Sequence, residues 1–310
     1  MNTIAHITSP WVDRKRQPPY PQRPLPRKPK VKPGRDKALT LAAGFRCRGG
    51  IILCADSEIT RSGILKVPGN KILTAKHGGV SLAVTGAGDW SYVQMTFQKI
   101  ADKFDQLGDP DLTLPAIQQI IEQTILGVYD TFVSVDRENP AFTIIAATRT
   151  TDEELNLLFS HQSPTVVRCD GFDCTGAGEI LASYLADIFY EPDSSINRGV
   201  FLAAYVLRLA KTYVSGVGGR SDILLMTPDG EMRFQRRDFV KDLEGTFERF
   251  DAILNPILFS LPDIHLPEDQ FDEKLADFNT KIRGLRQQLK EGHKLDFLSE
   301  LDDLLDSPFS

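Results

Sequence analysis

The sequence contains few cysteines and histidines, two residue types that often bind metals or take part in nucleophilic catalysis. The spacings of its four cysteines, from Cys47 to Cys54 and from Cys169 to Cys174, match no common zinc-binding pattern. We therefore interpret the cysteines as small buried hydrophobic residues. Four histidines likewise fit no arrangement of nucleophile and base: His77, His161, His265 and His293. The sequence indicates no metal and no organic cofactor.

One acidic residue follows a strand that is predicted to be buried. Residues 51–55 (IILCA) form a continuous apolar run, which is typical of a strand covered on both faces, and Asp56 comes directly after it. Gly49 and Gly50 predict a tight turn before this strand, and residues 38–45 predict the strand that leads into the turn. Asp56 either belongs to a chemical site at this strand end or only hydrogen-bonds a turn.

The remaining elements that would position such a site alternate in blocks of strands and pairs of helices. This order favours a layered α+β domain and argues against a doubly wound parallel sheet. Strands are predicted over residues 71–74, 80–85, 142–148, 155–160, 166–169, 222–226 and 231–234. Helices are predicted over residues 90–107, 114–135, 176–190 and 196–214, with Asp89 as a cap for the first of them.

This order, together with several local motifs, resembles the proteasome β-type subunits among the N-terminal nucleophile hydrolases. The resemblance covers about residues 39–236, and its strength lies in the order and distances of the motifs rather than in any one of them. The motifs are Thr40, Gly44, Gly50 and Ala55-Asp56 at the family spacing, LAVTGAGDW (82–90), CTGAG (174–178) and VGGRSDILLMTPDG (217–230).

The resemblance implies a fold and a set of site residues. The fold would be a four-layer αββα sandwich of the N-terminal nucleophile hydrolase type. Thr40 would be the nucleophile, activated by its freed α-amine, because a threonine hydroxyl needs an adjacent base. Lys71 would assist, Asp56 would orient Lys71, and the backbone N–H of Gly86 would stabilise the oxyanion. By the same resemblance, Thr60 would bind substrate backbone and Val84 would line a specificity pocket.

Each of these residues also has a plainer interpretation, and the sequence departs from the family pattern at several positions. Thr40 could be an exposed strand residue, Lys71 a solvated loop residue, and Gly86 a site of close helix packing. Glycine usually precedes the threonine in members that process themselves, whereas Leu39 stands here. Supporting polar residues of the family are replaced by Ala177, Val214 and Val217.

Two function hypotheses therefore remain for the central part of the chain. The first is a threonine-type peptidase that is released by cleavage at Leu39-Thr40 and hydrolyses peptide or protein substrates. The alternative is a non-catalytic structural paralogue of a proteasome-type subunit. The resemblance further implies a ring-forming homo-oligomer or related subunits, and an ATPase partner that controls access.

Two flanking segments differ in composition from this central domain, residues 38–237. Residues 1–37 contain ten Lys or Arg, two Asp and eight Pro, which predicts an extended basic arm, a pro-segment or a tether. No nucleic-acid-binding signature accompanies this arm, so a nucleic-acid partner is not favoured. Residues 238–310 contain seventeen Asp or Glu and eight Lys or Arg. Helical apolar spacing over 239–258 and 271–289 predicts an acidic helical C-terminal extension.

The whole chain has 310 residues with 41% hydrophobic and 25% charged residues, the composition of an ordinary globular protein. No apolar run approaches the roughly 18 residues of a membrane span, and we see no secretory signal. From these features we expect no membrane association and a cytoplasmic location.

Overall fold

The computed structural model describes residues 40–61, 65–106, 112–136, 141–152, 154–161 and 163–292. The predicted basic arm, residues 1–37, and Leu39 lie outside the described residues. In the described part the fold is a mixed α+β fold with antiparallel sheets and six helices, which confirms this level of the prediction. None of the helices in these ranges is both long and apolar enough to cross a membrane.

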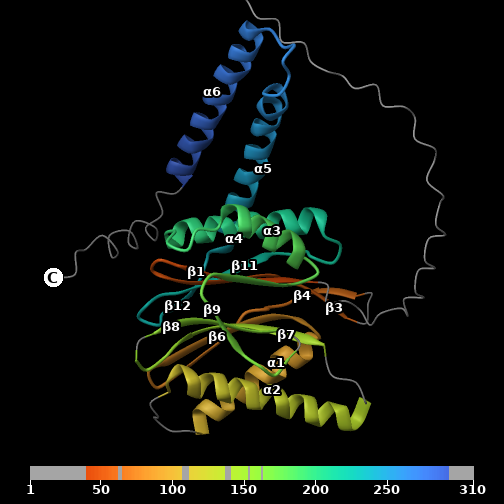
Figure 1. Ribbon diagram of the computed structural model, residues 1–310, viewed down its shortest axis with the longest axis vertical. Helices are drawn as coiled ribbons and strands as arrows, with labels where there is room; N and C mark the ends of the chain where they lie inside the picture. The colour runs from red at the N-terminus through yellow and green to blue at the C-terminus, as the bar shows by residue number, and fades with distance from the viewer. Residues whose placement is uncertain are drawn as a thin grey trace, which may run out of the picture. The chain divides into compact units, whose positions relative to one another are not determined.

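The first sheet contains the strand that ends at Asp56. Its five strands are antiparallel and follow the order β10-β1-β2-β11-β12. Helices α3 and α4 pack on one face of this sheet (Figure 1). The bounds are β1 (Leu41–Cys47), β2 (Gly50–Asp56), β10 (Phe172–Gly176), β11 (Ser221–Met226), β12 (Met232–Phe234), α3 (Glu179–Phe189) and α4 (Ile196–Tyr213).

The second sheet lies against the other face of the first. Its strands follow the antiparallel order β5-β6-β7-β8-β9, and α1 covers its outer face together with α2 (Figure 1). The bounds are β5 (Leu73–His77), β6 (Val80–Gly88), β7 (Phe142–Arg149), β8 (Leu155–His161), β9 (Val167–Cys169), α1 (Trp90–Gln106) and α2 (Leu114–Asp136).

Strand β2 shows why the run IILCA is apolar throughout. Ile52 and Cys54 belong to the hydrophobic cluster beneath α4, whereas Leu53 and Ala55 belong to the cluster between the two sheets. All seven residues of the strand are buried. Because successive side chains of a strand point to opposite faces, a strand covered on both sides needs apolar residues at nearly every position. This burial holds the end of β2, and thus Asp56, in a fixed place.

Two further helices follow the last strand. Helix α5 (Arg237–Ser260) packs on α4, and α6 (Glu268–Gly292) pairs with α5 in a hairpin that extends away from the sheets (Figure 1). Phe239, Val240 and Leu243 of α5 are buried in the same cluster as the residues of α4. The first part of α5 is therefore packed into the core of the main body.

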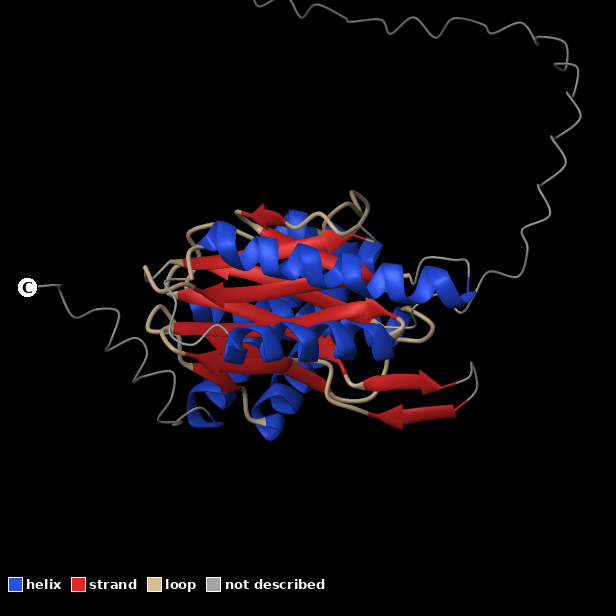
Figure 2. Ribbon diagram, turned by 90° about the horizontal axis from the view of Figure 1, so that it is seen from below, coloured by secondary structure: helices blue, strands red, loops and turns tan. Residues whose placement is uncertain are grey.

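The structure differs from the predicted elements near the candidate site. No strand was predicted between Asp56 and Lys71, but a short hairpin of β3 (Glu58–Arg61) and β4 (Leu65–Pro68) lies in this stretch. Figures 1 and 2 show this hairpin extending beyond the sheets. Strand β5 begins at Leu73 rather than at Lys71, and the first sheet gains β10. Strand β10 pairs with β1 over a long sequence separation, which a local pattern does not report.

Candidate active site

The carboxylate of Asp56 lies at the centre of a buried cluster of hydrogen-bond donors. Its side chain is completely buried at the end of β2. Oδ1 accepts hydrogen bonds from the Thr40 hydroxyl (2.6 Å) and the Leu41 amide (2.8 Å). Oδ2 accepts from the amides of Gly218 (3.1 Å) and Glu58 (3.2 Å). These donors explain how an acidic group can be buried here, because an unpaired buried charge would be very costly.

Lys71 brings the compensating charge to this cluster. It is 3% exposed, and its Nζ lies 3.0 Å from Asp56 Oδ1 and also donates to the Thr40 hydroxyl. Burial lowers the pKa of Lys71 below its ordinary value, whereas the charge of Asp56 opposes this change. The carboxylates of Glu58 and Asp222 oppose it further. A lysine with a lowered pKa more readily becomes the neutral amine that can accept a proton.

Thr40 precedes β1 and is held by its backbone as well as by its hydroxyl. Its carbonyl oxygen accepts a hydrogen bond from the Gly178 amide (3.3 Å). Gly176 lies opposite Leu41 with a φ of +103°, and a Cβ there would be 2.3 Å from the Thr40 oxygen. Only glycine fits this conformation and this space. The segment CTGAG thus acts as a close backbone support for Thr40.

The structure therefore brings Thr40, Asp56 and Lys71 together, although they are far apart in the sequence. The hydroxyl contacts both an amine and a carboxylate, the two groups to which it could lose its proton. This arrangement has the parts of an activated hydroxyl nucleophile. The plainer interpretations of an exposed Thr40 and a solvated Lys71 do not agree with the exposed fractions of these residues, which are only 6% and 3%.

Gly86 has a different environment from these three residues. It lies in β6 opposite Ile144, and a Cβ at this position would be 2.1 Å from the carbonyl oxygen of Thr143. Close contact between strands β6 and β7 thus accounts for the glycine. The hydrogen bonds described above around Thr40 do not include Gly86, so its role as an oxyanion donor stays a prediction.

The two residues expected to contact substrate lie on separate elements. Val84 is completely buried in the cluster between the second sheet and its helices. Thr60 lies in β3, opposite Lys66 of β4. Neither position by itself shows a substrate pocket.

The three apolar replacements pack instead of forming hydrogen bonds with the site. Val217 is buried in the cluster on the α3–α4 side of the first sheet, and Ala177 and Val214 pack against that cluster. The next residue, Gly218, makes a contact that was not predicted from the sequence, since its amide binds Asp56. The only signal was the motif VGG, because a backbone donor leaves no trace in the type of its side chain.

Three of the four cysteines are buried, and the fourth is partly buried. Cys54 is completely buried, and burial raises its pKa to about 12. Burial also raises the pKa of Cys47 to about 11, and Cys174 is buried as well. Cys169 is half-buried. Within the described ranges, no group of three or more His, Cys, Asp or Glu residues could hold a metal ion.

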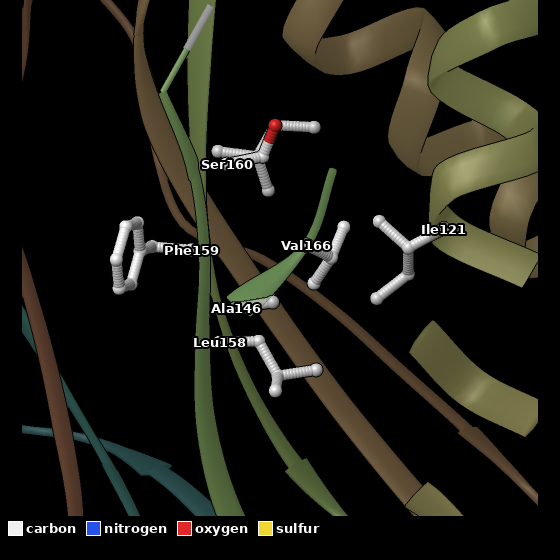
Figure 3. Close-up of a pocket in the computed structure, with 7 residues that line it drawn as sticks. Ile121, Ala146, Leu158, Phe159, Ser160 and Val166 are labelled. Atoms are coloured by element: carbon white, nitrogen blue, oxygen red, sulfur yellow. The ribbon is translucent and has the colours of Figure 1, made fainter. Parts of the chain in front are cut away.

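A small apolar gap lies between α2 and the second sheet, and Figure 3 shows Ile121 pointing toward Val166 and Leu158 across it. The hydroxyl of Ser160 donates to the carbonyl of Ser163, so this polar group is already bonded. The lining residues Ile121, Ile144, Leu158 and Val166 belong to the hydrophobic core. We interpret the gap as imperfect packing and not as a binding site.

Comparison with known proteins gives matches in structure only. No family model matches the chain, and no curated protein matches its sequence. Among solved structures, the chain is similar to the helical assembly of the Anbu complex from Pseudomonas aeruginosa, with 14% identity and a TM-score of 0.62 over 74% of this chain and 99% of that one. It is also similar to Anbu (ancestral beta-subunit) from Yersinia bercovieri, with 14% identity and a TM-score of 0.61 over 74% of this chain and 100% of that one. Anbu from Hyphomicrobium sp. strain MC1 is similar as well, with 14% identity and a TM-score of 0.61 over 72% of this chain and 98% of that one.

These similarities correct the resemblance drawn from the sequence. The prediction of a proteasome β-type subunit is wrong, because the structural neighbours are Anbu proteins, which are proteasome-like but distinct. The motifs that suggested the narrower family mark strand ends and glycine turns, such as Gly176.

Proposed function

We propose that the protein is an Anbu-like, proteasome-related hydrolase in which Thr40 is the nucleophile that cleaves amide bonds. Its fold would be the four-layer sandwich of the N-terminal nucleophile hydrolases, and residues 1–39 would be a removable pro-segment. The observation that carries the proposal is the buried cluster in which the Thr40 hydroxyl contacts both Lys71 and Asp56. A structural role alone would not require three polar groups in a buried position.

The proposed reaction is acyl transfer to the threonine. Oγ of Thr40 attacks the carbonyl carbon of a peptide bond, and its proton passes to a neutral base, which is the freed α-amine or Lys71. The tetrahedral intermediate collapses when the leaving amine takes a proton from that base, which leaves an ester on Thr40. Water then hydrolyses the ester and regenerates the hydroxyl. Asp56 holds Lys71 and Thr40 in place, and the Gly86 amide is the proposed oxyanion donor.

The decisive experiment combines intact mass, amino-terminal sequencing and labelling with a threonine-directed electrophile on the protein purified from its cells. We expect a chain that starts at Thr40, carries one equivalent of label and cleaves peptides. Thr40→Ala should abolish labelling, and Thr40→Ser should keep it. The matched control is Thr74→Ala in β5, a threonine outside the cluster. An intact amino terminus with no labelling would overturn the proposal.

A non-catalytic relative is the second candidate. The observation that favours it is the packing of Ala177, Val214 and Val217, which leaves the cluster without the polar support expected from the sequence resemblance. This candidate predicts an assembled protein that keeps its amino terminus and is unaffected by Thr40→Ala.

Self-assembly is part of either candidate. The Anbu complex from Pseudomonas aeruginosa forms a helical assembly, which supports a homo-oligomer for this chain. Sedimentation velocity on the purified protein should show a species several times heavier than the 34.5 kDa chain. A monomer at all concentrations would contradict this part of the proposal. A ring, its size and an ATPase partner stay predictions from the sequence resemblance.

A further inference from the structure

The acidic residue Asp222 lies beside the Thr40 cluster but has no part in the mechanism above. It is on β11, where the strand register places it opposite Ala55, the residue before Asp56. The preceding residue, Ser221, is opposite Asp56 itself. Two acidic residues on neighbouring strands therefore lie at the same end of the first sheet.

Asp222 projects to the face of the first sheet that the second sheet covers. Directly opposed residues in an antiparallel pair project to the same face, and Ala55 faces the second sheet. Ile72, the residue after Lys71, is buried in that same layer between the sheets. Asp222 is only 8% exposed, so water does not fully screen its charge.

The charges around these two residues are defined by the structure. The charges of three carboxylates, those of Asp56, Glu58 and Asp222, favour the protonated form of Lys71 and so raise its pKa. Glu58 is also paired with Lys66. Burial raises the pKa of Asp222, whereas Arg220 and Arg237 lower it, and Asp56 and Lys71 act on it in opposite directions. Arg237 is the first residue of α5.

We propose that Asp222 is a positioning residue of the Thr40 site that acts through Lys71 by setting how tightly the amine holds its proton. An ionised Asp222 stabilises the ammonium form, which is held against Asp56 and Thr40. Loss of this charge favours the neutral amine, which is the form that can take a proton from Thr40. Asp222 would thereby set the pH at which Lys71 changes from an anchor of the cluster to a base. The inference deepens the proposed function and rests on it for its catalytic meaning.

The test is a titration of the Lys71 side chain by NMR in the full-length protein, with lysine labelled at Nζ. The Lys71 signal is assigned by its loss in Lys71→Arg. In Asp222→Asn we expect the midpoint of the Lys71 titration to fall by about one pH unit, the size typical for a close charge partner. Asp222→Glu, which keeps the charge, should shift it much less.

Controls separate this effect from others. Asp187→Asn removes the same charge from an exposed position on α3 and should leave the Lys71 midpoint where it is. Asp222→Ser is a second neutral variant, in case the asparagine variant does not fold. An unchanged midpoint in the folded neutral variant would overturn the inference. Because the titration needs no cleavage at Thr40 and no peptide hydrolysis, its result is independent of whether the proposed activity is found.

Discussion

Asp56 organises the candidate site because so many donors converge on one carboxylate. Two side chains and three backbone amides, from four different parts of the chain, bind its two oxygens. Removing the carboxylate would leave all these groups without their acceptor in a buried place. The site and the stability of the fold are therefore linked at this residue.

Asp56→Ala should lower the free energy of unfolding by about 3–5 kcal/mol, the cost of breaking a buried ion pair by removing one partner. Urea denaturation measures this difference. The control is Asp187→Ala, at an exposed position of α3, for which we expect a change within about 0.5 kcal/mol. Similar losses in the two variants would contradict the central role of Asp56.

Lys71 should make stability depend on pH in the alkaline range. Its pKa is lowered in the folded protein, whereas the unfolded chain keeps the ordinary value of 10.5. Between the two values the unfolded state binds more protons, so stability rises with pH in this window. Relative to Lys71→Met, the wild type should gain stability as the pH rises toward 10.5, the ordinary pKa that the unfolded chain keeps.

Urea denaturation of both proteins across this range is the measurement. Lys290→Met, which replaces an exposed lysine on α6, serves as the comparison for general effects of alkaline pH. A wild-type advantage over Lys71→Met that falls as the pH rises would show that the pKa is not lowered by burial.

At the scale of elements, the backbone of β10 and the start of α3 support Thr40 from one side. Gly178 donates its amide to the Thr40 carbonyl, and Gly176 approaches the same oxygen closely. Strand β10 must therefore stay in register with β1 for the threonine to keep its place.

Gly176→Ala should disturb this support, since φ is +103° and the new Cβ would clash with the Thr40 carbonyl. We expect a loss of about 1–3 kcal/mol of stability and a displaced Thr40. The matched control is Gly245→Ala in the middle of α5, where nothing lies within 4 Å of the new Cβ. That variant should be neutral or more stable by about 0.5–1 kcal/mol, because alanine favours a helix.

Thermal unfolding of both variants measures these effects, and labelling at Thr40 reports the site. Equal stability of the two alanine variants would mean that β10 adapts to the new side chain.

At the scale of the molecule, α5 connects the C-terminal segment to the main body. Glu244 of α5 accepts a hydrogen bond from Ser221 (2.5 Å) and forms an ion pair with Lys211 of α4 (2.6 Å). Ser221 is the strand neighbour of Asp56. The C-terminal segment is therefore linked to the end of the first sheet at which the candidate site lies.

Truncation after Arg236 should destabilise the whole protein, because it uncovers the core residues that Phe239, Val240 and Leu243 cover. A chain that ends at Leu266 keeps α5 and should lose much less. Calorimetry should show one cooperative transition for the full chain and a lower melting temperature for the chain that ends at Arg236. Unchanged melting after removal of residues 237–310 would instead show that the main body does not need α5 for its stability.

Much of the fold was determined by patterns that the sequence displays locally. The run from Ile51 to Ala55 predicted a strand covered on both faces, and this burial is observed. The alternation of strand blocks with helix pairs predicted the mixed α+β class. Helical spacing after residue 238 also predicted helical structure where α5 and α6 lie. Such patterns are readable because neighbouring residues on one element share a single environment.

Prediction of the candidate site needed information about contacts between residues far apart in the sequence. The sequence resemblance named Thr40, Asp56 and Lys71, but only the tertiary structure shows their contacts. The β3–β4 hairpin and strand β10 escaped prediction because their pairing depends on partners and not on their own short sequences. The resemblance also named the wrong kind of protein, since the structural neighbours are Anbu proteins.

The sequence by itself thus determined which residues are apolar, where strands and helices alternate, and which polar residues stand at strand ends. Only the tertiary structure decided that Lys71 is buried, that the Gly218 amide binds Asp56, and that Asp222 lies opposite Ala55. The reason is physical. Burial, charge and hydrogen-bond partners depend on which strands pair and in which register, and these are properties of the folded chain as a whole.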